Sequence, residues 1–375
     1  DACLHWAEAL LKHNNLPENV LIVIVPQYNI GGSLNRSCCT RANQKGPENQ
    51  GFRGNGQNLD LNRDFMKVDS DNARSFQALM QFFDPDIIVD THSTNGADYQ
   101  YTMTLIPYQF EKWPQPLQNM GNMWFDDVKE NLSKEVKTSN YVNVWGTTPE
   151  NGFSAFELSS LFSGGYAGLF RTLGFTAEAH MFKSYPERVE ATIKTLDAAL
   201  KSAIKYRSEI KMSRNKALLS DLVMNRYATK WVLDSTQKQI LQFEGYQADY
   251  FTSTLTGQNR YSFDSNKPIT FPVDYYPRYK AMSYADVPMN YYFHRGSHKI
   301  ISMLKNSGVE VEQLKSDTTI DGFVDYVSDI TYAHGPYEGH FPHSEFTLTR
   351  TPVKEHFLKG DYVINTRQKC IRYIL

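Results

Sequence analysis

The spacing of apolar residues over the first 206 positions predicts helices that alternate with buried strands. Leu4–Lys12 and Asn72–Phe83 have the apolar period of an amphipathic helix. Val20–Val25 (VLIVIV), Asp86–Val89 (DIIV) and Gly174–Ala179 (GFTAEA) are short apolar runs typical of buried strands. Short apolar strands separated by helices predict an α/β fold, with a mixed, mostly parallel sheet covered by helices on both faces.

A change of pattern after Tyr206 predicts a second domain. The last helix before this change presents one apolar face, formed by Val189, Ile193, Leu196, Leu200 and Ile204. One more helical stretch follows, and then short aromatic-rich segments separated by Gly, Pro, Asn and Asp, with an amphipathic helix near His298–Lys305. We therefore expect an α/β domain over residues 1–206 and a smaller β-rich domain over residues 207–375.

Both ends of the chain have the pattern of interrupted elements. The last residues, Lys369–Leu375 (KCIRYIL), are predicted to form a strand that ends without a turn, and the first helix has no strand before it. We expect the chain to be a fragment of a longer protein that lacks its N-terminal part.

Composition excludes several classes of partner. The chain has 375 residues, 41% of them apolar, and a formal net charge of −2, so a broadly basic surface for nucleic acid or anionic lipid is excluded. The longest aliphatic run, Val20–Val25, is far shorter than the roughly 20 residues of a membrane-spanning helix. Adjacent cysteines rarely pair, and no Cys-x-x-Cys spacing occurs among Cys3, Cys38, Cys39 and Cys370. The redox compartment and the oligomeric state stay open.

Polar residues follow the predicted strands where an open α/β sheet places its functional groups. PQYNIGG follows Val20–Val25, DTHSTNG follows Asp86–Val89, and Glu178 lies at the end of the third strand. In an Asp-x-His sequence, one imidazole nitrogen of His92 can ligate a metal while a nearby carboxylate or carbonyl holds the other. A lone histidine beside an aspartate is more often structural, so the interpretation of His92 as a metal ligand depends on the other polar features near it.

A polar loop, FRGNGQNLDLNRDF, lies between the first two of these features. Within it, Arg53, Asn62 and Arg63 form R-x8-N-R, and DTH and FTAE follow in order. This series resembles the zinc metallocarboxypeptidases of the carboxypeptidase A type, over about residues 1–205. NQKGPENQGF before the loop, TNGADYQY after the histidine and YEGHFPHS near the end are similar to a bacterial branch of that family.

The resemblance implies a peptidase that removes C-terminal residues, together with a role for each residue. Arg63 and Asn62 would bind the terminal carboxylate of the substrate, as a planar cationic fork and a neutral amide donor. Arg53 would stabilise the oxyanion, and Asp60 would orient a zinc-bound histidine. His92 would ligate the one Zn²⁺ ion. The resemblance also implies a secreted or periplasmic location.

Two further roles follow from the same resemblance. Glu178 would act as the general base that takes the proton of the zinc-bound water. Tyr166, in SGGYAG, is the candidate for a mobile tyrosine near the leaving group, although most of the 23 tyrosines must be structural.

The other two zinc ligands of the family form a His-x-x-Glu pair. His5 and Glu8 have this spacing, but the family places the pair on a loop before the helix, and His5 lies too close to Asn29 for that arrangement. We expect the true pair upstream of Asp1, and this stretch alone to bind zinc weakly and to lack full activity.

A histidine-rich segment, HGPYEGHFPH, offers a second possible metal cluster by spacing alone, from His334, Glu338, His340 and His343. Its prolines and glycines within the β-rich part predict a structural turn instead.

Three functions stay open on these residues. The first is the zinc carboxypeptidase. The second is a related amidohydrolase that acts on an N-acyl amino acid or a peptidoglycan peptide. The third is an inactive protein that binds carboxylates. Each would take a peptide or acyl-amino-acid ligand with a free carboxylate.

Overall fold

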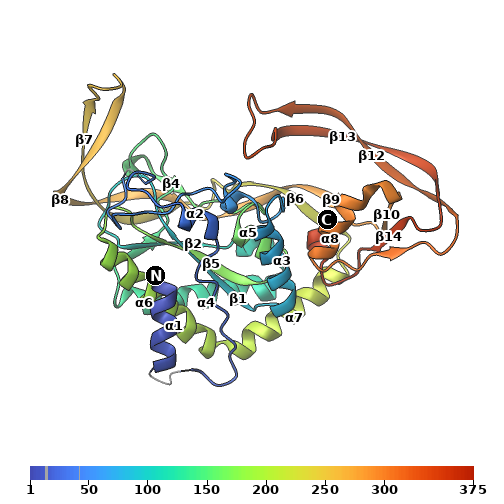
Figure 1. Cartoon of the computed structure of the whole chain (residues 1–375), viewed down its shortest axis with the longest axis horizontal. Helices are drawn as coiled ribbons and strands as arrows, with labels where there is room; N and C mark the ends of the chain where they lie inside the picture. The colour runs from blue at the N-terminus through green and yellow to red at the C-terminus, as the bar shows by residue number, and fades with distance from the viewer. Residues whose placement is uncertain (13–15, 42) are drawn as a thin grey trace.

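The computed structural model describes residues 1–12, 16–41 and 43–375. An α/β part lies at the centre; one long hairpin extends from it, and a second extends from the C-terminal part beside it (Figure 1). Among the described residues, none of the helices combines the length and the apolar composition that crossing a bilayer requires.

The central sheet is mixed, with strand order β1-β5-β2-β3. β1 and β5 are parallel, β2 runs antiparallel to β5, and β3 is parallel to β2. These strands are β1 (Ile87–Ser93), β2 (Met103–Pro107), β3 (Thr138–Asn140) and β5 (Leu173–Ala179). The predicted strands at DIIV and GFTAEA are thus confirmed as parallel neighbours, while β2 and β3 were not predicted.

Helices surround this sheet. They are α1 (Ala2–Lys12), α2 (Ile30–Leu34), η1 (Leu61–Arg63), α3 (Asp71–Phe83), η2 (Phe110–Lys112), α4 (Gln115–Ser133), η3 (Pro149–Asn151), α5 (Ser163–Gly168), α6 (Tyr185–Lys205) and α7 (Arg207–Leu222). The predicted helices at α1, α3 and α6 are confirmed. Ser70 caps α3 by accepting a hydrogen bond from the Ala73 N–H at 3.1 Å. The long helix α4 was not predicted.

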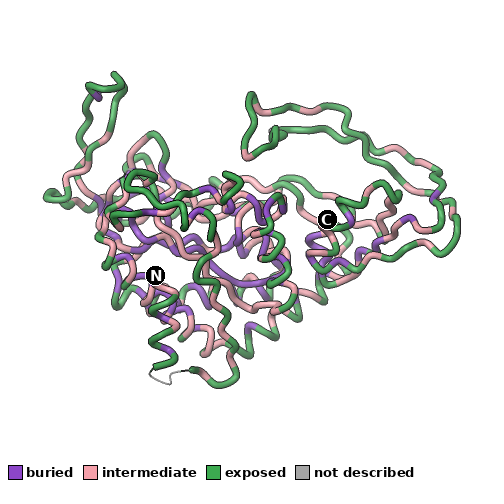
Figure 2. Tube along the Cα trace, in the orientation of Figure 1, coloured by how far each residue is buried: buried purple, intermediate pink, exposed green. Residues whose placement is uncertain are grey.

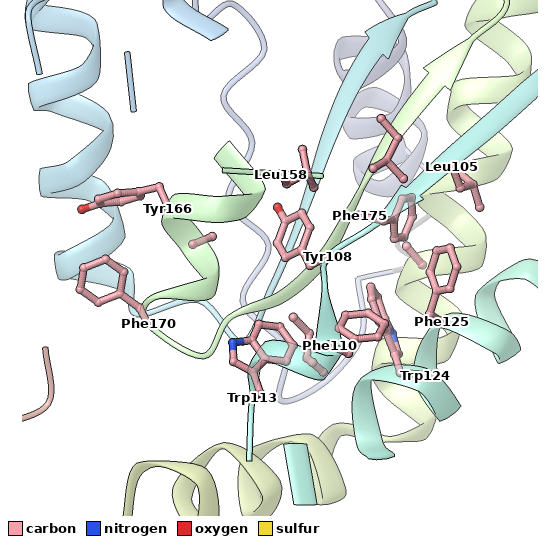
Figure 3. Close-up of a cluster of buried hydrophobic side chains, with 14 of the residues drawn as sticks. Leu105, Tyr108, Phe110, Trp113, Trp124, Phe125, Leu158, Tyr166, Phe170 and Phe175 are labelled. Carbon is pink, nitrogen blue, oxygen red and sulfur yellow. The ribbon is translucent and has the colours of Figure 1, made fainter. Parts of the chain in front are cut away.

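The two faces of the sheet have different coverings. Val89 packs toward Trp6 and Leu196, so α1 and α6 cover one face. On the same face, the Phe175 ring lies 5.7 Å from that of Trp124 on α4 (Figure 3). Because side chains alternate along a strand, Asp90 points to the opposite face, where it contacts α5. Helices therefore cover both faces, as predicted.

The second half of the chain is rich in strands, as predicted. It contains β6 (Arg226–Leu233), β7 (Gln239–Thr252), β8 (Asn259–Tyr276), β9 (Tyr279–Asp286), β10 (Asn290–Phe293), η4 (Arg295–Ser297), α8 (His298–Asn306), β11 (Glu312–Gln313), β12 (Thr318–Tyr332), β13 (His343–Phe357), β14 (Tyr362–Asn365) and α9 (Ile371–Ile374). The β7–β8 and β12–β13 hairpins are mostly exposed (Figure 2). The short strand β4 (Phe153–Ser154) pairs with β8.

The two halves of the chain share a hydrophobic core. Ile301, Ile364 and Tyr373 from the second half belong to the same buried cluster as Phe175. The division into two domains at residue 206 stays a prediction.

A buried charge cluster joins the C-terminal end to the α/β part. Asp221, at the end of α7, is 1% exposed. Its Oδ2 accepts hydrogen bonds from Arg171 Nη1 at 3.0 Å and from Arg372 Nε at 2.6 Å. Its Oδ1 accepts a third, from Arg372 Nη2 at 2.8 Å. One carboxylate thus pairs with two buried guanidinium groups.

Three expectations are corrected. Val20–Val25 forms neither a strand nor a helix: Ile22 and Ile24 pack against the cluster of Trp6, Leu10 and Leu196, while Leu21, Val23 and Val25 are exposed. The segment Lys369–Leu375 forms the short helix α9 rather than a strand, with Ile371 buried against the core. Cys38 and Cys39 are joined by a disulfide, in a loop whose backbone follows neither a helix nor a strand.

Candidate active site

His92 and Glu178 lie side by side at the carboxyl ends of two parallel strands. The register of β1 and β5 makes them direct partners. Because paired residues on adjacent strands point to the same face, both side chains project from the face that α5 covers. This is the arrangement that the sequence predicted for a zinc ligand and a general base.

Asp90 holds one nitrogen of the His92 ring. Its Oδ2 lies 2.9 Å from His92 Nε2, and it also accepts a hydrogen bond from the Ser163 hydroxyl on α5. Burial lowers the pKa of His92, but the Asp90 carboxylate outweighs this effect and raises it to about 9. The Asp-x-His pattern therefore forms the oriented histidine that its spacing indicated.

Glu178 has an unusual environment. Burial raises its pKa to about 7, against the lowering effects of His92, Arg53 and Arg41. Its Oε2 is buried and has no hydrogen-bond partner among the described residues. A buried carboxylate oxygen without a partner is costly in a native protein, so it indicates a position at which a ligand, a water molecule or an ion binds.

The polar loop brings Arg53 into the same charge cluster. Arg53 Nε and Nη2 donate to Asp60 Oδ2 at 2.9 and 2.7 Å, and its Nη1 has no partner among the described residues. Asn29, from the predicted PQYNIGG segment, donates from Nδ2 to the Arg53 carbonyl at 2.8 Å. The Arg53 charge lowers the pKa of Glu178 and of His92, so all three lie close to one another.

Asp60 pairs with a residue of its own loop. It pairs with Arg53, and its Oδ1 accepts a hydrogen bond from the Asn62 N–H at 3.0 Å, which caps η1. No histidine lies within hydrogen-bond distance of Asp60 among the described residues. Asp60 therefore orients Arg53 and the short helix that carries Asn62 and Arg63, and its expected role toward a zinc-bound histidine stays a prediction.

Arg63 lies on an aromatic ring. Its guanidinium carbon is 4.4 Å from the centroid of Phe162, and its Nη1 donates to the Asn62 carbonyl at 2.8 Å. Among the described residues, no carboxylate is paired with Arg63. Ser163, the neighbour of Phe162, contacts Asp90, so a short chain of contacts links Arg63 to His92.

Tyr166 lies in the hydrophobic core and not at the site, which corrects the expectation that it contacts substrate. It is fully buried, and its ring packs against that of Phe170 (Figure 3). Its ring also contacts Tyr373, and its hydroxyl lies 3.1 Å from Ser307 Oγ. The short helix α5 turns Ser163 toward the sheet and Tyr166 toward α8, so the two residues serve different parts of the structure.

His92 fits one ligand position of a zinc ion. Asp90 occupies Nε2, and Nδ1 has no partner among the described residues, which is the carboxylate–histidine arrangement typical of metal ligands. The described residues contain no group of three or more His, Cys, Asp or Glu side chains placed to hold a metal ion. His5 and Glu8 are exposed on α1, whose buried side packs on α6.

Sequence reasoning missed three residues of this site: Arg41, Phe162 and Ser163. Arg41 interacts electrostatically with Arg53, Asp60 and Glu178, and burial lowers its pKa. Arg41 comes from a segment without a recognisable pattern, and Phe162 is one of 22 phenylalanines. Ser163 begins the SGGYAG segment, but the motif directed attention to Tyr166 instead.

Comparison of the chain with protein-family models, with curated protein sequences and with solved structures gives no match. The resemblance to the metallocarboxypeptidases therefore rests on the motif residues of the sequence alone.

Proposed function

We propose that this chain carries the carboxylate clamp and the general base of a zinc-dependent hydrolase that removes residues from the carboxyl ends of peptides. The observation that carries the proposal is the environment of Arg63. Its guanidinium group lies on the Phe162 ring and forms no ion pair with a carboxylate among the described residues. A planar fork of this kind is suited to the carboxylate of a ligand. Its loop also holds Arg53 beside Glu178 and His92.

Each residue has a defined part in this proposal. Arg63 and the Asn62 amide bind the terminal carboxylate of the peptide. Arg53 donates from its free Nη1 to the carbonyl oxygen as that oxygen gains negative charge. Glu178 takes a proton from the attacking water and gives it to the leaving amine. A bound zinc ion, for which His92 would be a ligand, would act as a Lewis acid.

Arg63→Ala is expected to raise KM about tenfold or more for a peptide with a free C-terminal carboxylate, because a hydrogen bond to a charged group is lost. The kcat value should change little, since Arg63 contacts the carboxylate both before and during the reaction. Steady-state kinetics on a zinc-loaded protein that has the full set of zinc ligands, with the amidated peptide alongside, measures this effect. Arg63→Lys is the matched control, which keeps the charge but loses the planar fork. Equal cleavage of both peptides, with no effect of Arg63→Ala, would contradict the clamp.

His92→Ala and Asp90→Asn are expected to weaken zinc binding. Loss of the carboxylate that orients a ligating histidine typically costs about 10–100-fold in affinity, so Asp90→Asn should lie in that range and His92→Ala should lose more. Competition with a chelator measures both affinities without any need for activity. The exposed His298→Ala serves as the control. Unchanged zinc affinity in His92→Ala would place the ion elsewhere.

A further inference from the structure

The tip of the β12–β13 hairpin, residues 333–342, contacts the loop that carries the carboxylate clamp. The Asp60 N–H donates to Glu338 Oε2 at 2.7 Å. His340 Nε2 lies 2.7 Å from Asp69 Oδ2, and Lys67 Nζ donates to the Glu338 carbonyl at 3.4 Å. The histidine-rich segment is thus a turn, as predicted, and it is anchored on a loop far away in the sequence. In Figure 1 the closed end of the hairpin lies back above the α/β part.

The backbone of this tip does not favour a glutamate. Glu338 and Gly339 have φ values of 49° and 75°, between Tyr337 and His340, whose backbone groups form two mutual hydrogen bonds. Two-residue turns with both φ values positive favour Asn, Asp or Gly at the first position, because a larger side chain is strained there. The turn itself gives no reason for Glu338, and its contact with Asp60 supplies one.

The contact reaches the functional groups in one further step. Asp60 pairs with Arg53 through one carboxylate oxygen and caps η1 through the other. η1 carries Asn62 and Arg63. Glu338 therefore holds the backbone of Asp60, and both Arg53 and the carboxylate clamp depend on the position of Asp60. Asp69 forms the second contact. Burial raises the pKa of its carboxyl group, but the hydrogen bonds from Lys67 and His340 outweigh this effect and hold the pKa below its usual range.

We infer that Glu338 is a positioning residue of the candidate active site: the hairpin tip fixes Asp60, and Asp60 in turn fixes Arg53 and the Asn62–Arg63 clamp. For its kinetic consequence, this inference rests on the proposed function. Glu338 itself takes no part in bond making or breaking. The β12–β13 hairpin, which lies in the second half of the chain, thereby completes a site built by the first half.

Two substitutions separate the effect of the Glu338–Asp60 hydrogen bond from the effect of the turn conformation. Glu338→Gly suits the positive φ but removes the acceptor, whereas Glu338→Gln keeps an acceptor oxygen at the same place. Hydrogen exchange of residues 58–64, measured by mass spectrometry, should be about tenfold faster in Glu338→Gly and close to wild type in Glu338→Gln. The melting temperature of Glu338→Gly should stay close to that of the wild type, because relief of the strain at the turn opposes the loss of the hydrogen bond to Asp60.

Steady-state kinetics of the same variants test whether the position of the loop affects activity. For a peptide with a free C-terminal carboxylate, kcat/KM should fall about tenfold in Glu338→Gly, mainly through KM, and stay within about twofold in Glu338→Gln. If Glu338 served only the turn, glycine would suit its position at least as well as glutamine, and kcat/KM would not be lower in Glu338→Gly than in Glu338→Gln.

The outcomes are distinct. Unchanged exchange of residues 58–64 in Glu338→Gly overturns the inference, whatever the activity. Faster exchange with unchanged kcat/KM also overturns it, because the loop would then move without effect on the site. Faster exchange in a zinc-loaded protein that cleaves no peptide with a free carboxylate supports the positioning of the loop by Glu338 and overturns the proposed function instead.

Discussion

Glu178→Gln, in a zinc-loaded protein that has the full set of zinc ligands, is expected to lower kcat by about 10² or more while KM stays nearly unchanged. Glutamine fills the same space but cannot accept the proton of the attacking water. The residue lies directly opposite His92 in the β1–β5 register, and burial raises its pKa to about 7, a value suited to a base at neutral pH. The carboxylate clamp lies on another segment, so binding should persist.

Steady-state kinetics with an N-acylated dipeptide measures this loss. The matched control is Glu190→Gln on α6, where the glutamate is exposed and pairs with Lys194 at 2.9 Å. This control should leave kcat unchanged. A kcat within about threefold of wild type in Glu178→Gln would remove Glu178 from the proton-transfer step, since general-base catalysis contributes at least about 10².

Asp221→Ala is expected to lower the free energy of unfolding by about 3–5 kcal/mol, because it leaves two buried guanidinium groups without a counter-charge. Arg171 and Arg372 are 2% and 7% exposed, so water cannot replace the lost carboxylate. Urea denaturation, followed by tryptophan fluorescence, gives the change in midpoint at constant slope.

Asp286→Ala is the control for this prediction. Asp286 has a side chain that is 76% exposed and forms long ion pairs with Arg226 and Arg350, at 3.9 and 4.0 Å. Exposed pairs contribute about 0–1 kcal/mol, so its loss should be small. If Asp221→Ala is no more destabilising than Asp286→Ala, the buried cluster does not stabilise the junction between the two halves.

Local sequence patterns predicted the elements that carry the base and the oriented histidine. Asp86–Val89 and Gly174–Ala179 are apolar runs that end in polar residues, and parallel strands bring such ends to one edge of a sheet. The proximity of His92 to Glu178 follows from that rule. The detail that Asp90 holds Nε2 follows from the two-residue period of a strand, which places Asp90 and His92 on one face.

The errors concern contacts between segments that are distant in the sequence. Val20–Val25 has the composition of a strand, but composition does not determine whether a neighbour pairs with it. Tyr166 lies in the core, where its ring packs against Phe170 and Tyr373 and its hydroxyl contacts Ser307, and no local pattern reveals these contacts. The anchoring of Glu338 on Asp60 spans 278 positions, which places it beyond any periodicity argument.

Calorimetric titration with an N-acylated dipeptide and with its C-terminal amide tests most directly whether Arg63 and Asn62 form a site for the terminal carboxylate of a peptide. We predict that the amide binds at least about tenfold more weakly, as expected when a charge-assisted hydrogen bond is lost, and that Arg63→Ala abolishes the difference. Equal affinities of the wild-type protein for the two peptides would contradict the proposed carboxylate site.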